Sequence, residues 1–155
     1  MANNSNKPTV FGRSLKLENG DFAFEERDLA LVAGRDNFLQ AMQVMIETPF
    51  GTDVFNVNYG FDILGILSSA QSVRLTKELI RLNIVKSVSQ DNRVQQIKEV
   101  VFDDEPRFFE ILTDQNSADH ELARRTKRSW EAVVVLQTIS EGEVALRLEG
   151  TGLKT

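Results

Sequence analysis

The stretch QDNRVQQIKEVVF, residues 90–102, marks the point where the sequence changes character. Before it, apolar residues recur at helical spacing, whereas after it β-branched and aromatic residues come in short runs bounded by turns. Within the stretch, Asp91-Asn92 ends the helical pattern, and residues 94–102 are rich in strand-forming side chains. The sequence therefore predicts an α+β fold in which two main helices pack on a small, mostly antiparallel sheet that ends in a C-terminal hairpin.

Two amphipathic helices are predicted before this stretch. The first spans residues 35–48, where one buried face is formed by Phe38, Leu39, Met42, Met45 and Ile46. It should end before Pro49, because the residue that precedes a proline avoids the α region, and Gly51 can adopt positive φ in the turn that follows. The second helix spans residues 71–89. Between the helices we expect an ordered loop with at most one short strand, anchored by apolar side chains: Val54, Phe55, Val57, Tyr59 and Phe61.

Strand patterns follow the second helix. Residues 94–102 form the first strand, and a turn at residues 103–106 should join it to an antiparallel partner at residues 108–112. Residues 113–129 are polar and indicate a loop or a short exposed helix. Residues 130–139 are apolar on both alternating faces, which is typical of a strand covered on both sides.

The last strand pattern alternates apolar residues with outward-facing ones. Val144, Leu146 and Leu148 alternate with Ala145, Arg147 and Glu149, after a turn at residues 140–143. This pattern predicts a half-buried strand that forms a hairpin with residues 130–139.

Length and composition exclude several classes of protein. The 155 residues suit one domain, and we predict a flexible N-terminal arm over residues 1–20 and a single domain over residues 21–155, beginning with a short extended segment at residues 21–24. Without cysteine there is no disulfide scaffold and no thiolate zinc site. A net charge of −5 argues against nucleic acid as a partner. No apolar run approaches the length of a membrane span, and the first residues do not resemble a signal peptide, so we expect a cytoplasmic protein.

Candidate catalytic groups are few. Asp103, Asp104 and Glu105, with Glu110 nearby, form the densest carboxylate cluster, and glycoside hydrolysis requires such a pair. Acidic residues beside a proline are more often ordinary turn chemistry, and this interpretation is favoured here.

Other sites are also poorly supported by the sequence. His120 is the only histidine, which excludes a histidine-rich metal site. Gly60 and Gly65 lack the lysine or third glycine of a phosphate-binding loop, so no cofactor is predicted. The basic run at residues 124–128 is interpreted as a solvated loop face, with an acidic protein surface as the alternative partner.

The order of these features resembles a known family. The first helix runs into TPFGTD at residues 48–53 and then NYGFD at residues 58–62, which are similar to the turn T-x-x-G-[ED] and the aromatic-glycine-acid sequence of the sheath initiators. These are baseplate wedge proteins of contractile phage tails, with relatives in type VI secretion and extracellular contractile injection systems. The resemblance covers roughly residues 29–150.

The family's Glu-Pro-Arg motif lies between the second helix and the following strand. At that point this chain has Asp91 and Arg93, and the resemblance implies that this acid-x-Arg pair binds the baseplate wedge protein. A literal Glu105-Pro106-Arg107 lies between two predicted strands and is interpreted as a hairpin turn. The sequence leaves open which pair fills the family's role. For Arg93, a surface arginine beside a helix end is the alternative.

The resemblance implies a structural role without catalysis, in six copies around an inner tube, within a phage tail or tail-like particle. Partners would be the wedge protein and the sheath protein, with the inner tube or hub protein as a further candidate. The implied sheath-binding edge, which would accept a strand of the sheath protein, comprises Val144, Ala145, Leu146, Arg147, Leu148 and Glu149. Family members have been labelled lysozyme-like, so a glycoside hydrolase is one alternative and a generic protein-interaction domain is another. The kind of injection system stays open.

Overall fold

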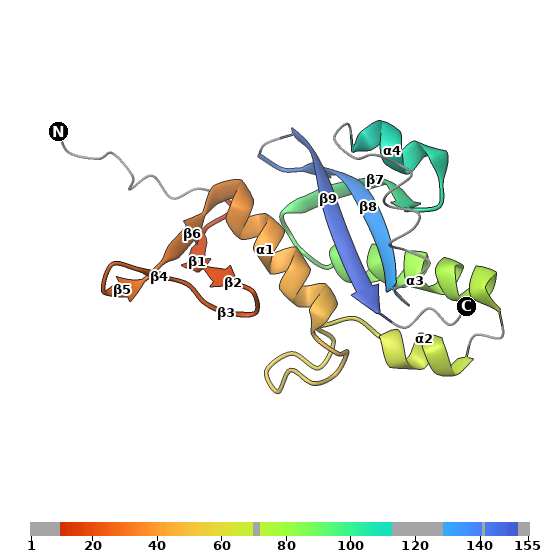
Figure 1. The fold of residues 1–155 in the computed structure, drawn as a ribbon, viewed down its shortest axis with the longest axis horizontal. Helices are drawn as coiled ribbons and strands as arrows, with labels where there is room; N and C mark the ends of the chain where they lie inside the picture. Colours follow the sequence, from red (N-terminus) through yellow and green to blue (C-terminus); the bar gives the residue numbers. More distant parts are fainter. Residues whose placement is uncertain (1–9, 70–71, 113–128, 141, 152–155) are drawn as a thin grey trace. The chain divides into compact units, whose positions relative to one another are not determined.

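A computed structural model describes residues 10–69, 72–112, 129–140 and 142–151 (Figure 1). Its contacts divide the chain into two compact units, residues 1–43 and residues 44–155. The boundary between the units lies within a helix, α1 (Gly34–Glu47). The single domain predicted over residues 21–155 stays a prediction, and each unit is described by itself.

The first unit contains six short strands that pair as three antiparallel ribbons, β1 with β6, β2 with β3 and β4 with β5. The strands are β1 (Arg13–Leu15), β2 (Leu17–Glu18), β3 (Asp21–Phe22), β4 (Phe24–Glu25), β5 (Asp28–Leu29) and β6 (Leu31–Ala33). β2 and β3 are joined by Asn19-Gly20, with φ values of 52° and 83°, which suit a tight hairpin turn. The extended segment predicted at residues 21–24 is confirmed. Part of the predicted flexible arm thus forms β1 and β2, and residues 1–9 lie outside the described residues.

The helix α1 confirms the first predicted helix. In the first unit its buried Asn37 donates through Nδ2 to the carbonyl of Phe11 at 2.7 Å, and Phe38 stacks on Phe11 with ring centroids 5.1 Å apart. The chain before β1 is therefore held against the first turns of the helix. After the helix, Thr48 bonds back to the Val44 carbonyl, and Gly51 adopts the expected positive φ of 79°.

The second unit is built on a three-stranded antiparallel sheet in the order β7-β8-β9. Its elements are α2 (Ile63–Ser69), α3 (Val73–Val88), β7 (Val94–Phe102), α4 (Pro106–Ile111), β8 (Ser129–Thr138) and β9 (Gly142–Thr151). The helix α3 contacts α2 and β7, whereas α4 contacts β7 and β8 (Figure 1). The predicted α+β fold, the second helix and the C-terminal hairpin are confirmed.

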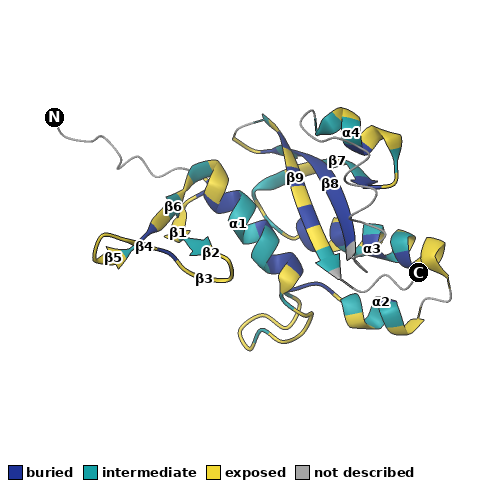
Figure 2. Cartoon of the chain, in the orientation of Figure 1, coloured by how far each residue is buried: buried dark blue, intermediate teal, exposed yellow. Residues whose placement is uncertain are grey.

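The central strand β8 carries the core of this unit. Figure 2 shows it dark blue over almost its whole length, as expected for a strand covered on both faces. On one face, Trp130 contacts the rings of Phe61 and Phe102, with centroids 5.9 and 6.2 Å away. On the other face, Val133 and Val135 pack with Val101 of β7 and Phe108 of α4.

Two local predictions are corrected. Residues 108–112 are predicted as a strand paired with residues 94–102, but residues 108–111 belong to α4 and Leu112 caps it, and β7 pairs instead with β8. The cause is Pro106 at the first turn of α4, where its fixed φ suits a helix and its missing N–H is not needed. Glu105-Pro106-Arg107 is therefore a helix start and not the hairpin turn that was predicted. The second correction is α2, which occupies part of the predicted loop; the Asp62 carboxylate accepts the Gly65 N–H at its first turn, at 2.9 Å.

Candidate functional site

The two residues assigned to wedge binding lie in the tight turn between α3 and β7, and they contact each other. The Arg93 guanidinium donates to the Asp91 carboxylate from Nε at 2.9 Å and from Nη2 at 2.6 Å. The Arg93 backbone N–H donates to the same carboxylate at 2.8 Å. Asp91 is itself tied to the helix end, since its N–H donates to the Val88 carbonyl. The pair therefore forms a two-pronged fork that fixes the direction in which the chain leaves α3.

Burial and charge act in opposite directions on this pair. Burial raises the pKa of Asp91, but the hydrogen bonds from Arg93 and its positive charge outweigh burial, so the pKa lies below its ordinary value. The hydrogen bond with Asp91 raises the pKa of Arg93. Burial also raises the pKa of the nearby Tyr59, and the charges of Asp53 and Asp91 add to this effect. Asp91 and Arg93 thus form a charged pair within a half-buried junction. That this pair binds a partner stays a prediction.

This depressed pKa predicts an acid-sensitive contribution to stability. The contribution is present above the unfolded-state pKa, near 3.8, and is lost as the pH falls through the lower folded-state pKa. Between about pH 6 and pH 2, the wild-type protein should lose more free energy of unfolding than an Asp91→Asn variant, which has no carboxylate at this position. Urea unfolding at several pH values measures the difference. Equal losses in the two proteins would show that the fork adds no stability.

The literal Glu105-Pro106-Arg107 lies at the other end of β7. Arg107 is exposed and pairs with Glu110 at 2.9 Å and with Glu99 at 3.2 Å. Glu105 pairs with Arg81 of α3. The two candidate arginines therefore differ in setting: Arg93 is half-buried in a turn, whereas Arg107 is on the exposed side of α4.

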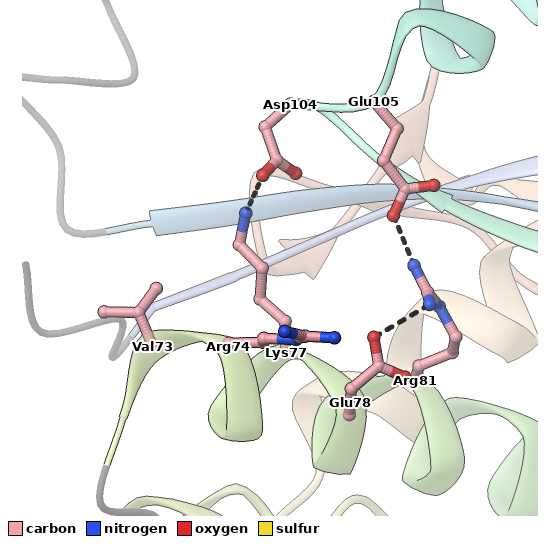
Figure 3. A pocket seen from close by; sticks show the side chains of 7 residues that line it. All are labelled: Val73, Arg74, Lys77, Glu78, Arg81, Asp104 and Glu105. Atoms are coloured by element: carbon pink, nitrogen blue, oxygen red, sulfur yellow. Dashed lines mark hydrogen bonds and ion pairs between the residues drawn. The ribbon is translucent and has the colours of Figure 1, made fainter.

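Two members of the predicted carboxylate cluster, Asp104 and Glu105, border a pocket of about 430 Å³ on the α3 side of β7 (Figure 3). Lys77 pairs with Asp104, and Arg81 pairs with Glu105 and with Glu78. In Figure 3 the Asp104 carboxylate points to Lys77, and the Glu105 carboxylate points to Arg81. The cations also lie over the Phe102 ring, at 5.9 Å for Lys77 and 5.3 Å for Arg81. These ion pairs join α3 to the end of β7, so a structural role accounts for Asp104 and Glu105.

The predicted sheath-binding residues lie on β9, which is an edge strand: of the strands described, only β8 pairs with it. Val144, Leu146 and Leu148 are buried, whereas Ala145, Arg147 and Glu149 are exposed, which confirms the predicted alternation (Figure 2).

The pairing register shows which main-chain groups of β9 face outward. Ile139 donates to Arg93, and Glu131 accepts from Asp103, so the odd-numbered residues of β8 turn their main-chain groups toward β7. The even-numbered residues therefore bond to β9, whose register with β8 is unbroken from Ser129↔Thr151 to Thr138↔Gly142. On β9 the N–H and C=O groups of Ala145, Arg147 and Glu149 consequently point away from β8.

One surface was misjudged from the sequence. Val54, Phe55 and Val57 were expected to be buried anchors, but their side chains are 87%, 101% and 63% exposed. The loop that carries them is ordered, since the Asp53 carboxylate accepts the N–H groups of Phe55 at 2.8 Å and Asn56 at 3.0 Å. Isolated apolar residues without helical or strand periodicity do not reveal which way they face.

Several remaining candidates receive no structural test. His120 and the basic run at residues 124–128 lie outside the described residues. Across the parts of the chain that are described, there is no cluster of three or more potential metal ligands, and no helix is long and apolar enough to cross a membrane. Compared with known proteins, the chain matches no protein-family model and no curated protein.

Proposed function

We propose that this protein is a structural component of the baseplate of a contractile injection system, where it accepts a strand of the first sheath ring on β9. Its other contact is with the baseplate wedge protein at the Asp91–Arg93 turn. In this role it is not an enzyme, and six copies surround the inner tube.

The observation that carries the proposal is the outer side of β9. This strand runs for ten residues, and among the described strands none pairs with its outward N–H and C=O groups. An exposed edge of this length favours unwanted association, and proteins usually shorten, charge or cover it. A strand from another chain would satisfy these groups and gain affinity through main-chain hydrogen bonds.

The resemblance in sequence supports the choice of partner. The elements that carry it occur in the expected order: the helix α1, the turn at residues 48–53, the helix α3, the acid-x-Arg turn and the terminal hairpin. The assignment to a contractile system rests on this order of motifs, whereas the proposal of strand addition rests on the geometry of β9.

The glycoside hydrolase alternative gains no support from three of the four clustered carboxylates. Asp104 and Glu105 hold cations of α3, and Glu110 holds Arg107. A glycosidase requires two carboxyl groups that face each other across a sugar-binding cleft, one of them kept protonated by an apolar setting. The generic interaction domain stays an alternative, and it differs from our proposal only in the identity of the partner.

Proline substitution tests the outer edge of β9 directly. Ala145→Pro removes an N–H that points away from β8, so we expect the protein to stay folded while sheath no longer polymerises on the baseplate. The variant is co-expressed with the tube, wedge and sheath proteins of its own system. Circular dichroism checks the fold, and electron microscopy counts the tubes that carry sheath.

Two matched variants accompany this experiment. Ala145→Thr keeps the N–H at the same exposed position and should assemble normally. Leu146→Pro removes a donor to β8 together with a buried side chain and should unfold the sheet. Normal sheathed particles formed by a folded Ala145→Pro protein would exclude strand addition at this edge.

A further inference from the structure

The exposed face of β9 carries three charged side chains, and two of them are already neutralised within the sheet. Lys98 of β7 pairs with Glu143, and Arg147 pairs with Glu131 of β8. The third, Glu149, lies directly opposite Glu131 in the β8–β9 register. Within the described part of the chain, no ion pair involves Glu149.

This arrangement leaves a surplus of negative charge at one position of the outer edge. Like charges directly opposite each other on neighbouring strands are unfavourable, and Arg147 is placed against the more buried of the two carboxylates, Glu131. Glu149 is exposed, and its N–H and C=O point away from β8. In an antiparallel added strand, the residue that bonds to these groups would have its Cα about 5.5 Å from the Cα of Glu149, with the two side chains next to each other on the same face.

The buried face of β9 determines which side chains an added strand should carry on that side. Val144, Leu146 and Leu148 are at most 3% exposed, and they extend the apolar layer of the sheet to its edge. Side chains of an added strand on this face would continue that layer. The two faces together therefore define an alternating pattern for the incoming strand.

We infer that β9 selects a strand with alternating apolar residues on one face and a lysine or arginine opposite Glu149 on the other. This inference rests on the proposed function, because it describes the strand that the outer edge accepts. The incoming strand needs no acidic residue opposite Arg147, since Glu131 of this protein already neutralises that guanidinium. Charge at one register position thus distinguishes the correct strand from others of equal apolar character.

Synthetic peptides test the inference. The probes are blocked peptides of about nine residues that alternate valine and threonine, with the central threonine replaced by lysine or by glutamate. Binding to the full-length protein is followed by nuclear magnetic resonance, through the backbone amide shifts of Ala145, Arg147 and Glu149. We expect the lysine peptide to bind about threefold to tenfold more tightly than the glutamate peptide, and the preference to shrink at high salt.

Variants of the protein separate the possible results. Glu149→Lys should reverse the preference, whereas Glu78→Lys, which makes the same charge change on α3, should leave it intact. If both peptides bind wild-type protein equally and Ala145→Pro abolishes binding, the edge accepts strands but charge selection is wrong. If neither peptide binds, or if Ala145→Pro has no effect on binding, strand addition itself is contradicted, and the inference fails with it.

Discussion

Replacing Gly60 by alanine is expected to lower the free energy of unfolding by about 3 kcal/mol. Gly60 has φ of +105°, a conformation that side chains rarely adopt, and an added Cβ would lie 2.5 Å from the Thr48 carbonyl oxygen and 3.0 Å from the Pro49 carbonyl carbon. Both atoms belong to the backbone and are held in place, because Thr48 accepts from the Phe61 N–H. The loop would have to open, which would also disturb the bond from the Ser87 hydroxyl to the Gly60 carbonyl. Urea unfolding measures the loss.

Gly51 provides the matched control for this prediction. It also has positive φ, 79°, but the nearest atom to an added Cβ would be 3.8 Å away, at ordinary contact distance. Gly51→Ala should therefore show the cost of backbone strain alone, about 1–2 kcal/mol. If the two variants lose the same stability, then the close approach at Gly60 contributes nothing.

The second large effect concerns partner binding. Arg93→Ala should weaken binding of the wedge protein by about 2–5 kcal/mol. If the Arg93 guanidinium binds acceptor groups of the partner, its loss leaves those acceptors buried and unpaired. Arg107→Ala should have little effect, since Arg107 is exposed and pairs only with surface carboxylates in the described structure. Calorimetric titration with the purified wedge protein measures both. A result in which Arg107→Ala is the damaging change would place the family's motif at residues 105–107.

The Arg93→Ala binding experiment requires a control, because this substitution also leaves the half-buried Asp91 without its cation. The double variant Asp91→Ala/Arg93→Ala removes both charges and should recover most of the stability lost in Arg93→Ala. If the double variant also recovers wedge binding, then Arg93 acts only by holding the turn. Binding that stays weak in a stable double variant would support direct contact between the turn and the partner.

The long periodic segments of the fold could be predicted from the sequence, and the short ones could not. For α1, β8 and β9, the spacing of apolar residues over ten or more positions reports which side chains are buried. The pattern also predicts the helix α3, but Leu75, Leu82 and Val85 of its apolar stripe are exposed. The helix α4 is only six residues long, and its run of Phe108-Phe109-Glu110-Ile111 is equally compatible with a strand. Pro106 was the informative residue: it was interpreted as part of a turn, although proline is also common at the first helical position.

The candidate site shows a similar division. The alternation on β9 follows from strand geometry, so its buried and exposed residues could be assigned in advance. The direction of its main-chain groups depends on pairing with β8 and required the structure. The contact between Asp91 and Arg93 could not be foreseen either, because an acid-x-Arg sequence does not reveal whether the arginine turns back onto its own turn or outward to a partner. Exposure of the loop at residues 54–57 depends on tertiary packing in the same way.

The position of Trp130 has a practical consequence for spectroscopy. It is the only tryptophan in the chain, and its side chain is 2% exposed. Gly150 lies opposite it, where an added Cβ would come within 2.6 Å of the indole ring. The fluorescence emission of Trp130 therefore reports solely on the sheet of residues 44–155, while residues 1–43 contribute no tryptophan signal. A fluorescence transition that coincides with the one seen by circular dichroism would indicate that both units unfold together, and separate transitions would indicate that they are thermodynamically independent.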